Sequence, residues 1–310
     1  LNTAINNGTF VVSGRAHIVV KEGEKLELDK ETLALFGDFF SGQPDLIIDA
    51  SGRKRLIPNL LKLETQTGKR KDKALFAHFE GVEFSQGIGN IHMHMCEKGW
   101  SWRIPLQGKT SVGIVADRNY LAEFGTNNED QYDNFIKQDT RLSPFLKDAK
   151  RISGIQQYSN YQMETAKLYG PNWVLAGDTA GFLDPVFSSG LYLAMTNPIR
   201  IAKALDESED YQLLDYQKDW NQELTSWKKM IEIWYNGRLF STYLVGQDRM
   251  KTLIGRKIEP HVVKHFTRIF TGEAVHSQYS MWLLKFMSGN LLDLMKRTGM
   301  HHHNYQSLAI

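Results

Sequence analysis

The residue types best suited to chemistry lie in one stretch of the chain, from Gly177 to Gly190. Residues 172–176 are a short apolar run, typical of a buried strand, and Gly177 and Asp178 follow it directly. In open α/β sheets, ligands bind beyond the carboxyl ends of the strands. A carboxylate at this place can accept hydrogen bonds from a ligand's hydroxyl groups, and a glycine lets the backbone pass close to it. The alternative for Asp178 is a helix N-cap, but the small residues around it favour a ligand site.

The end of this stretch combines hydroxyl groups with a helix start. Ser188, Ser189 and Gly190 precede a helical pattern from Leu191 to about Leu205. The first turn of a helix carries unpaired N–H groups and the positive end of the helix dipole, which together bind anions. Serine at a helix start is more often only a cap, so the residues alone leave both interpretations open.

Residues 100–105, Trp-Ser-Trp-Arg-Ile-Pro, alternate in the manner of a strand. Trp100, Trp102 and Ile104 therefore share one face, and Pro105 follows them. Two tryptophans on one face of a sheet most often belong to a core. Taken alone, this segment favours packing over chemistry.

A weaker signal ends an earlier apolar run, residues 45–49. Asp49 can fix the backbone amides of the turn that follows, and Gly52 permits that turn to be tight. By itself the pattern is an ordinary exit from a buried strand. With Gly177 and Asp178 downstream, support of a shared ligand site is the better interpretation.

Two of these segments together carry a resemblance to a known family. Residues 100–105 fit the Trp-x-Trp-x-Ile-Pro pattern of flavin-dependent halogenases, and residues 182–190 fit their Phe-x-x-Pro-x-x-Ser-x-Gly pattern. The chain resembles this family over roughly residues 1–205. Residues 184–190, Asp-Pro-Val-Phe-Ser-Ser-Gly, point to the pyrrole- and phenol-type members.

The resemblance implies an FAD-dependent halogenase, which oxidises halide with reduced FAD and oxygen and halogenates an electron-rich aromatic substrate. A separate flavin reductase would supply the reduced FAD, and the substrate is either free or tethered to a carrier protein. The residues implied in cofactor binding are Asp49, Gly52, Gly177, Asp178, Gly181 and Pro185. The implied halide site is Ser188, Ser189 and Gly190. The implied barrier between flavin and substrate is Trp100, Trp102, Ile104 and Pro105.

No catalytic residue follows from the resemblance, because the family's lysine belongs to an N-terminal part of the pattern that this sequence lacks. An FAD-dependent monooxygenase or a prenyl-type reductase of the same superfamily shares the Gly-Asp turn. Halide-dependent product formation separates those enzymes from a halogenase. A flavoprotein half that acts only as a scaffold is the non-enzymatic alternative.

The opening motif of an FAD-binding Rossmann unit, Gly-x-Gly-x-x-Gly between a strand and a helix, does not occur in the sequence. Residues 87–92, Gly-Ile-Gly-Asn-Ile-His, match it only in part, since histidine replaces the third glycine and strand patterns flank both sides. They favour a hairpin turn. We expect a fragment without its front βαβ unit, rather than a half that binds no dinucleotide.

The composition excludes several classes of protein. With 37 basic and 35 acidic residues the formal net charge is +2, so no basic surface favours nucleic acid. The single cysteine, Cys96, excludes a disulfide framework, and no apolar run is long enough to span a membrane. His92 and His94 share a strand face but lack an evident third ligand, so we expect no metal site. The expected location is the cytoplasm.

The patterns predict an α/β fold in three parts. A partial Rossmann-like FAD-binding domain (residues 1–61 and 171–205) receives an inserted, mainly antiparallel β-sheet domain (62–170), and a helical C-terminal region follows (206–310). Strands are expected at residues 9–12, 16–20, 45–49, 74–84, 88–96, 100–115 and 172–176. Helices are expected up to Ile5, at 128–138 and 144–147, and through most of the chain from Leu191, with Trp227, Ile231 and Trp234 on one apolar face.

Overall fold

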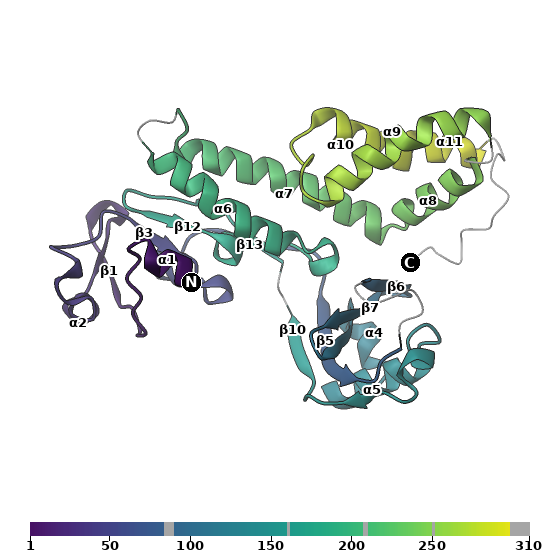
Figure 1. Cartoon of the computed structure of the whole chain (residues 1–310), viewed down its shortest axis with the longest axis horizontal. Coiled ribbons are helices and arrows are strands. Elements are labelled where there is room, and N and C mark those ends of the chain that lie inside the picture. Colours follow the sequence, from purple (N-terminus) through teal and green to yellow (C-terminus); the bar gives the residue numbers. More distant parts are fainter. Residues whose placement is uncertain (84–89, 160–161, 207–209, 250–251, 298–310) are drawn as a thin grey trace. The chain divides into compact units, whose positions relative to one another are not determined.

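The computed structural model describes the chain except for residues 84–89, 160–161, 207–209, 250–251 and 298–310. The described chain divides into two compact units. Unit 1 comprises residues 1–66 and 163–222, and unit 2 comprises residues 67–162 and 223–310. Both units mix helices and strands (Figure 1), which confirms the predicted α/β class. The predicted division into three domains stays a prediction.

Unit 1 is built on short strands and one long helix. Strands β3 (Ile47–Asp49) and β12 (Trp173–Leu175) form a parallel pair, and each lies within one of the predicted strands, residues 45–49 and 172–176. The helix is α6 (Ser189–Leu205), whose buried residues Leu193, Asn197 and Ile201 recur at every fourth position. The other elements of this unit are α1 (Asn2–Asn6), β1 (Ile18–Val20), β2 (Leu26–Leu28), α2 (Lys30–Ala34), α3 (Leu56–Leu60), β4 (Thr65–Thr67), β11 (Met163–Thr165) and β13 (Gly181–Phe182).

The parallel pair is buried unevenly. Trp173, Val174 and Leu175 of β12 are fully buried, whereas Ile48 of β3 is 50% exposed. The expectation that β3 is a buried strand is therefore wrong at Ile48. The reason is that β3 has only β12 as a neighbour in its sheet, among the residues the structure describes.

Unit 2 contains an antiparallel sheet whose strands run in the order β10-β5-β8-β7-β6, with β9 also paired to β5. These strands are β5 (Asp72–Glu80), β6 (His92–Cys96), β7 (Gly99–Leu106), β8 (Lys109–Asp117), β9 (Lys150–Arg151) and β10 (Gln156–Ser159). Helices α4 (Arg118–Ala122) and α5 (Asn128–Gln138) cover one face (Figure 1). Leu75, Ile114 and Tyr132 are fully buried between the sheet and these helices.

The C-terminal part is helical, as predicted. It consists of α7 (Leu213–Tyr235), α8 (Arg238–Arg249), α9 (Leu253–Phe270), α10 (Gln278–Lys285), a π-helical turn (Phe286–Leu291) and α11 (Leu292–Arg297). Trp227, Ile231 and Trp234 are all buried, which confirms the apolar face predicted for α7. None of the described helices combines the length and apolarity that a membrane span requires.

Several predicted element boundaries are wrong. Residues 9–12 form no strand, and the run 100–115 is two strands, because a turn at Gly108 (φ +71°) separates β7 from β8. Residues 144–147 belong to a 3₁₀ turn, Ser143–Leu146, and not to an α-helix. The start predicted for β6 at residue 88, and half of the glycine-containing turn at 87–92, lie outside the described residues.

Candidate functional site

The two loops predicted to form the ligand site leave the same edge of the parallel strand pair. Asp49 is in register with Leu175, and the Ala176 N–H donates to the Asp49 carbonyl at 3.0 Å. Because parallel strands end at one edge, the segments after Asp49 and after Ala176 start side by side. The structure thus brings together two segments that lie 128 residues apart, at Asp49 and Gly177.

The carboxylate of Asp49 is committed to its own loop. It is 5% exposed, and it accepts hydrogen bonds from the Ser51 N–H at 2.9 Å and the Ile57 N–H at 2.7 Å. The Thr179 hydroxyl approaches it at 3.5 Å. Gly52 adopts φ +63°, which only glycine takes without strain. These contacts belong to residues that hold a turn in shape, and their part in cofactor binding stays a prediction.

Arg55 ties this turn to the second one, and no sequence pattern pointed to it. Its guanidinium donates to the Thr179 carbonyl at 3.3 Å and to the hydroxyls of Thr165 at 3.0 Å and Thr65 at 2.8 Å. Burial lowers the pKa of Arg55, and the charge of Asp49 opposes that shift. An arginine next to Lys54 normally indicates a solvated surface, so its 4% exposure was not predictable from the sequence.

Two polar side chains at the turn after β12 have hydrogen-bonding groups without a partner among the described residues. Gly177 adopts φ +57°, and its N–H donates to the side-chain oxygen of Asn197 at 3.0 Å. Asn197 is fully buried on α6, and its Nδ2 has no hydrogen-bond partner within the described residues. Asp178 is half-buried, and no described group donates to its carboxylate. Burial raises the pKa of Asp178, and the nearby positive charge of Arg53 partly opposes the rise.

These groups fit a polar ligand rich in hydroxyls, such as the ribityl chain of FAD. Asn197 is fully buried, so it holds the Gly177 backbone in place from inside the protein and does not itself reach a ligand. The carboxylate of Asp178 supplies an acceptor on the same turn. Asn197 was missed by the sequence analysis, because an asparagine inside a helical pattern carries no signal of its burial.

The segment from Asp184 to Gly190 forms a compact link into α6. Asp184 is fully buried and accepts the Val186 N–H at 2.9 Å, and Pro185 opens a 3₁₀ turn. Ser188 adopts left-handed backbone angles (φ 54°, ψ 26°), and its side chain makes no capping hydrogen bond. The capping alternative for this serine is therefore wrong for its side chain. The helix begins at the buried Ser189.

The helix start and the Asp178 turn converge. A β-carbon at Gly190 would lie 3.6 Å from the Asp178 carboxylate and 2.8 Å from the ring of Phe182. Hydrogen bonding within α6 begins at Leu191, whose N–H donates to the Ser188 carbonyl at 3.1 Å. The N–H groups of Ser189 and Gly190 precede it and belong to the unpaired first turn.

The tryptophan segment lies in unit 2, on the sheet face opposite α4 and α5. Trp100 and Trp102 are 4% and 9% exposed, and their ring centroids are 5.3 Å apart. The Trp100 indole N–H donates to the Tyr235 hydroxyl at 3.0 Å, and that of Trp102 donates to the Ser111 hydroxyl at 3.1 Å. Gly113 leaves the room for Trp102, since a β-carbon there would lie 2.3 Å from its ring.

Trp100 and Trp102 thus share a face, as predicted, while Ile104 and Pro105 are half-exposed farther along β7. The predicted barrier role of these four residues stays a prediction, because the turn at Asp178 belongs to unit 1.

The other candidate residues are less informative. On the α4/α5 side of the sheet, His92 lies opposite Arg103 and His94 opposite Ser101. Burial raises the pKa of the Cys96 thiol to about 12, so the thiol stays protonated and unreactive near neutral pH.

The family model described as tryptophan halogenase matches residues 3–282. The flavin-dependent halogenase ptaM of Pestalotiopsis fici is 34% identical over 168 residues, which are 50% of this chain and 31% of that protein. The 1H-pyrrole-2-carbonyl-(peptidyl-carrier protein) chlorinase of Pseudomonas fluorescens is 26% identical over 228 residues, 66% of this chain and 49% of that protein. The chain therefore spans between about a third and a half of these relatives' length.

Two solved structures show the same fold. The flavin-dependent brominase Bmp2 superposes with a TM-score of 0.71 at 19% identity, over 96% of this chain and 73% of that one. A flavoprotein/dehydrogenase from Cytophaga hutchinsonii gives a TM-score of 0.71 at 21% identity, over 94% of this chain and 69% of that one. The structure therefore has the fold of FAD-binding halogenases.

Proposed function

Since this chain belongs to the tryptophan halogenase family, we propose that its parent protein is an FAD-dependent halogenase of an electron-rich aromatic substrate. One observation supports this most directly. The turn at Asp178, whose carboxylate accepts no hydrogen bond from the described residues, converges with the first turn of α6 at Gly190. A flavin site and an anion site side by side are what halide oxidation requires.

The proposed cofactor site uses the strand ends of unit 1. Asp178 accepts hydrogen bonds from flavin hydroxyls, and the Gly177 backbone and Asn197 amide lie beside it. Asp49, Gly52 and Arg55 hold the neighbouring turn, while Gly181 and Pro185 keep the following segment close and stiff. Bound reduced FAD supplies the reducing equivalents with which oxygen is activated.

The proposed halide site is the start of α6. The N–H groups of Ser189 and Gly190, with the Ser188 or Ser189 hydroxyl, provide donors at the positive end of the helix dipole. Trp100, Trp102, Ile104 and Pro105 are proposed to separate substrate from flavin, so that only a small oxidised halogen species passes. This last role is supported by the sequence pattern alone.

The proposed partners are a flavin reductase and a small aromatic substrate. Two relatives are named for a pyrrole-2-carbonyl group on a peptidyl-carrier protein, which supports the carrier-tethered alternative for this protein's substrate. We propose a cytoplasmic location, where the reductase and reduced flavin are supplied. No residue of this chain is proposed as the catalytic lysine.

The test is a reconstituted reaction of the parent protein with reduced FAD, oxygen and an aromatic substrate panel, with and without bromide. Halogenated product that requires reduced FAD, oxygen and bromide together supports the proposal. Asp178→Asn should weaken FAD binding in the same preparation. An oxygenated product that forms equally well without halide would identify a monooxygenase instead. FAD binding without any product in the whole panel would favour a scaffold.

A further inference from the structure

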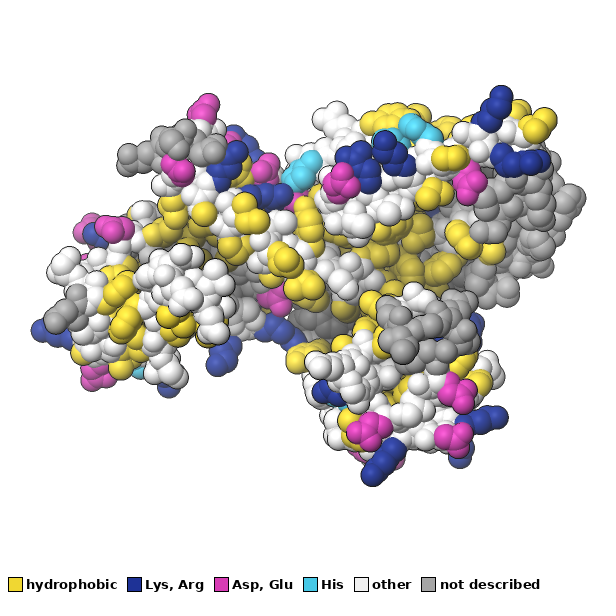
Figure 2. Space-filling view, viewed as in Figure 1, with side chains coloured by type: hydrophobic (Ala, Val, Ile, Leu, Met, Phe, Trp, Pro, Cys, Tyr) yellow, Lys and Arg dark blue, Asp and Glu magenta, His cyan; other side chains and the backbone are white. Residues whose placement is uncertain are grey.

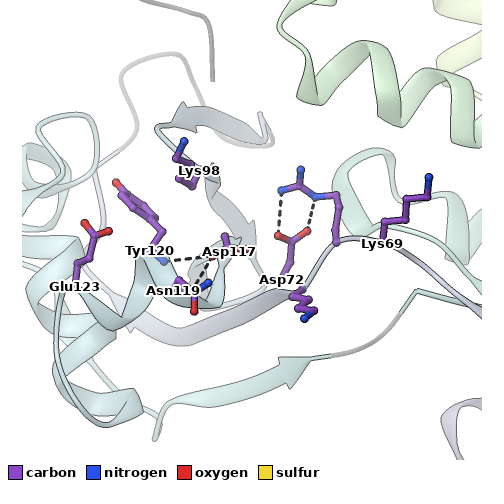
Figure 3. Close-up of a pocket in the computed structure, with 9 residues that line it drawn as sticks. Lys69, Asp72, Lys98, Asp117, Asn119, Tyr120 and Glu123 are labelled. Atoms are coloured by element: carbon purple, nitrogen blue, oxygen red, sulfur yellow. Dashed lines mark hydrogen bonds and ion pairs between the residues drawn. The ribbon is translucent and has the colours of Figure 1, made fainter.

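Unit 2 carries a hollow of about 500 Å³ whose lining includes none of the candidate cofactor, halide or barrier residues. Three parts of the chain line it: residues 69–72 at the start of β5, Lys98 in the turn between β6 and β7, and residues 117–123 from the end of β8 into α4 (Figure 3). All of them lie within the first segment of unit 2, residues 67–162.

The cations of this hollow are less neutralised than its anions. Lys69, Lys71 and Lys98 are exposed, and none forms an ion pair within the described part of the chain. Two of the three carboxylates are engaged. Asp72 is 4% exposed and accepts the Arg70 guanidinium through both oxygens, at 2.6 and 3.0 Å.

Asp117 is the second engaged carboxylate. It caps α4 by accepting the backbone N–H groups of Asn119 at 2.8 Å and Tyr120 at 3.4 Å. Glu123 is the third lining carboxylate, and, beside burial, it and the neighbouring Glu97 both help to raise the pKa of Tyr120. Three unpaired ammonium groups around one hollow therefore give it a positive potential, although the whole chain is nearly neutral.

Two neutral hydrogen-bond donors also line the hollow. Tyr120 reaches toward the same side as Lys98 in Figure 3. Burial raises the pKa of Tyr120 to about 12, so its phenol keeps a proton to donate at neutral pH. The side chain of Asn119 contributes an amide to the lining. Point-charge ammonium groups with hydroxyl and amide donors are the set that binds phosphate oxygens.

The hollow also borders the tryptophan pair. The Arg70 guanidinium lies 3.5 Å above the ring of Tyr235, and the Tyr235 hydroxyl accepts the Trp100 indole N–H at 3.0 Å. An anion that drew Arg70 away from Asp72 would release this stack. Occupation of the hollow is therefore expected to change the environment of Trp100.

We propose that this hollow is a binding site for a phosphate ester, which anchors the substrate or the arm that carries it beside the Trp100 face of the sheet. The inference rests on the proposed function in that it assigns the phosphate to the substrate side. A phosphorylated small molecule and the phosphodiester arm of a carrier protein share this chemistry. The surface lysines Lys69, Lys71 and Lys98 are its main determinants.

The experiment is calorimetric titration of the full 310-residue chain with inorganic phosphate and with pantetheine 4′-phosphate, at constant ionic strength set with chloride. Lys98→Gln and Lys71→Gln should each weaken binding about three- to ten-fold, the effect of one partly screened charge-assisted contact. The matched control is Lys137→Gln, an exposed lysine on α5 outside the hollow, which should leave binding unchanged. All three lysines are exposed, so circular dichroism should show the same folded state.

The ligands distinguish the two sources. Pantetheine 4′-phosphate that binds at least ten-fold more tightly than both phosphate and unphosphorylated pantetheine identifies the carrier arm. Equal binding of pantetheine 4′-phosphate and phosphate supports a small phosphorylated substrate. Absence of phosphate binding, or binding that Lys98→Gln and Lys137→Gln weaken equally, would overturn the site. These titrations need no halogenation, so the site and the proposed activity fail independently.

A spectroscopic measurement tests the border with Trp100. Phosphate should shift the tryptophan emission of the unaltered chain, and Tyr235→Phe should remove that shift while leaving the calorimetric affinity nearly unchanged. An emission shift that persists in Tyr235→Phe would show that the anion does not act through Arg70 and Tyr235.

Discussion

Unit 1 and unit 2 place the apolar residues of their strands in different surroundings. Val112 and Ile114 of β8 are fully buried, because neighbouring strands and the α4/α5 layer enclose them. Ile48 of β3 is 50% exposed, and Leu191, Met195 and Ile199 form an apolar row on α6 with 65–70% exposure. Figure 2 shows hydrophobic side chains along this part of unit 1.

The difference teaches that the candidate cofactor site is built on the less enclosed framework. Exposed apolar rows of this kind normally contact further protein or a ligand. The site residues of unit 1 are instead held by hydrogen bonds from or to the side chains of Asp49, Arg55 and Asn197. Packing stabilises the sheet of unit 2, whereas hydrogen bonds determine the local geometry of unit 1.

The largest expected loss of stability is in the sheet of unit 2, where apolar residues are more fully packed than in unit 1. Ile114→Ala, on β8, should cost about 2–5 kcal/mol, since it leaves a cavity in an enclosed core. Ile48→Ala, on β3, should cost under about 1 kcal/mol, because half of the side chain already contacts solvent. Hydrogen exchange of the β8 and β3 amides measures each unit separately. Equal costs at the two positions would mean that β3 is as enclosed as β8.

A second comparison concerns two carboxylates within unit 1. Asp49→Ala should destabilise the turn by about 1–3 kcal/mol, because the buried N–H groups of Ser51 and Ile57 lose their acceptor. Asp178→Ala should leave stability nearly unchanged and weaken FAD binding to the parent protein several-fold, the value of about one hydrogen bond. Fluorescence titration with FAD and thermal melts separate the two effects. If the Asp178→Ala variant binds FAD as tightly as the unaltered protein does, Asp178 is not part of the FAD site.

The raised pKa of Asp178 gives a pH dependence with opposite signs for stability and binding. Burial disfavours its charged form, so the folded chain binds this proton more tightly than the unfolded chain does. Unit 1 should therefore gain stability as the pH falls through the folded pKa, which lies above the ordinary 3.8. FAD affinity should fall over the same interval, because the protonated group is a poorer acceptor. Asp178→Asn should flatten both profiles, and a profile unchanged by the substitution would assign the titration to another group.

The sequence predicted strands at the positions of β3 and β12, the antiparallel sheet and the helical C-terminal region, because these follow from local apolar patterns. It also placed Trp100 and Trp102 on one face, since alternation along a strand is a local property. It did not predict the exposure of Ile48 or the burial of Arg55 and Asn197. Burial depends on which distant segments pack nearby, whereas the missed turn has a local signal in Gly108 itself.

The smallest expected effect compares the starts of two helices. In unit 2, the Asn127 side chain caps α5 by accepting the Asp130 N–H at 2.9 Å, so Asn127→Ala should cost about 1 kcal/mol. In unit 1, Ser188 makes no such bond and has left-handed backbone angles that disfavour any β-carbon. Ser188→Ala should therefore be nearly neutral, and Ser188→Gly should stabilise unit 1 by about 0.5–1 kcal/mol. Thermal melts of the three variants measure these differences. A loss in Ser188→Ala as large as that in Asn127→Ala would show that Ser188 acts as a cap in solution, and would favour capping over halide binding for its hydroxyl.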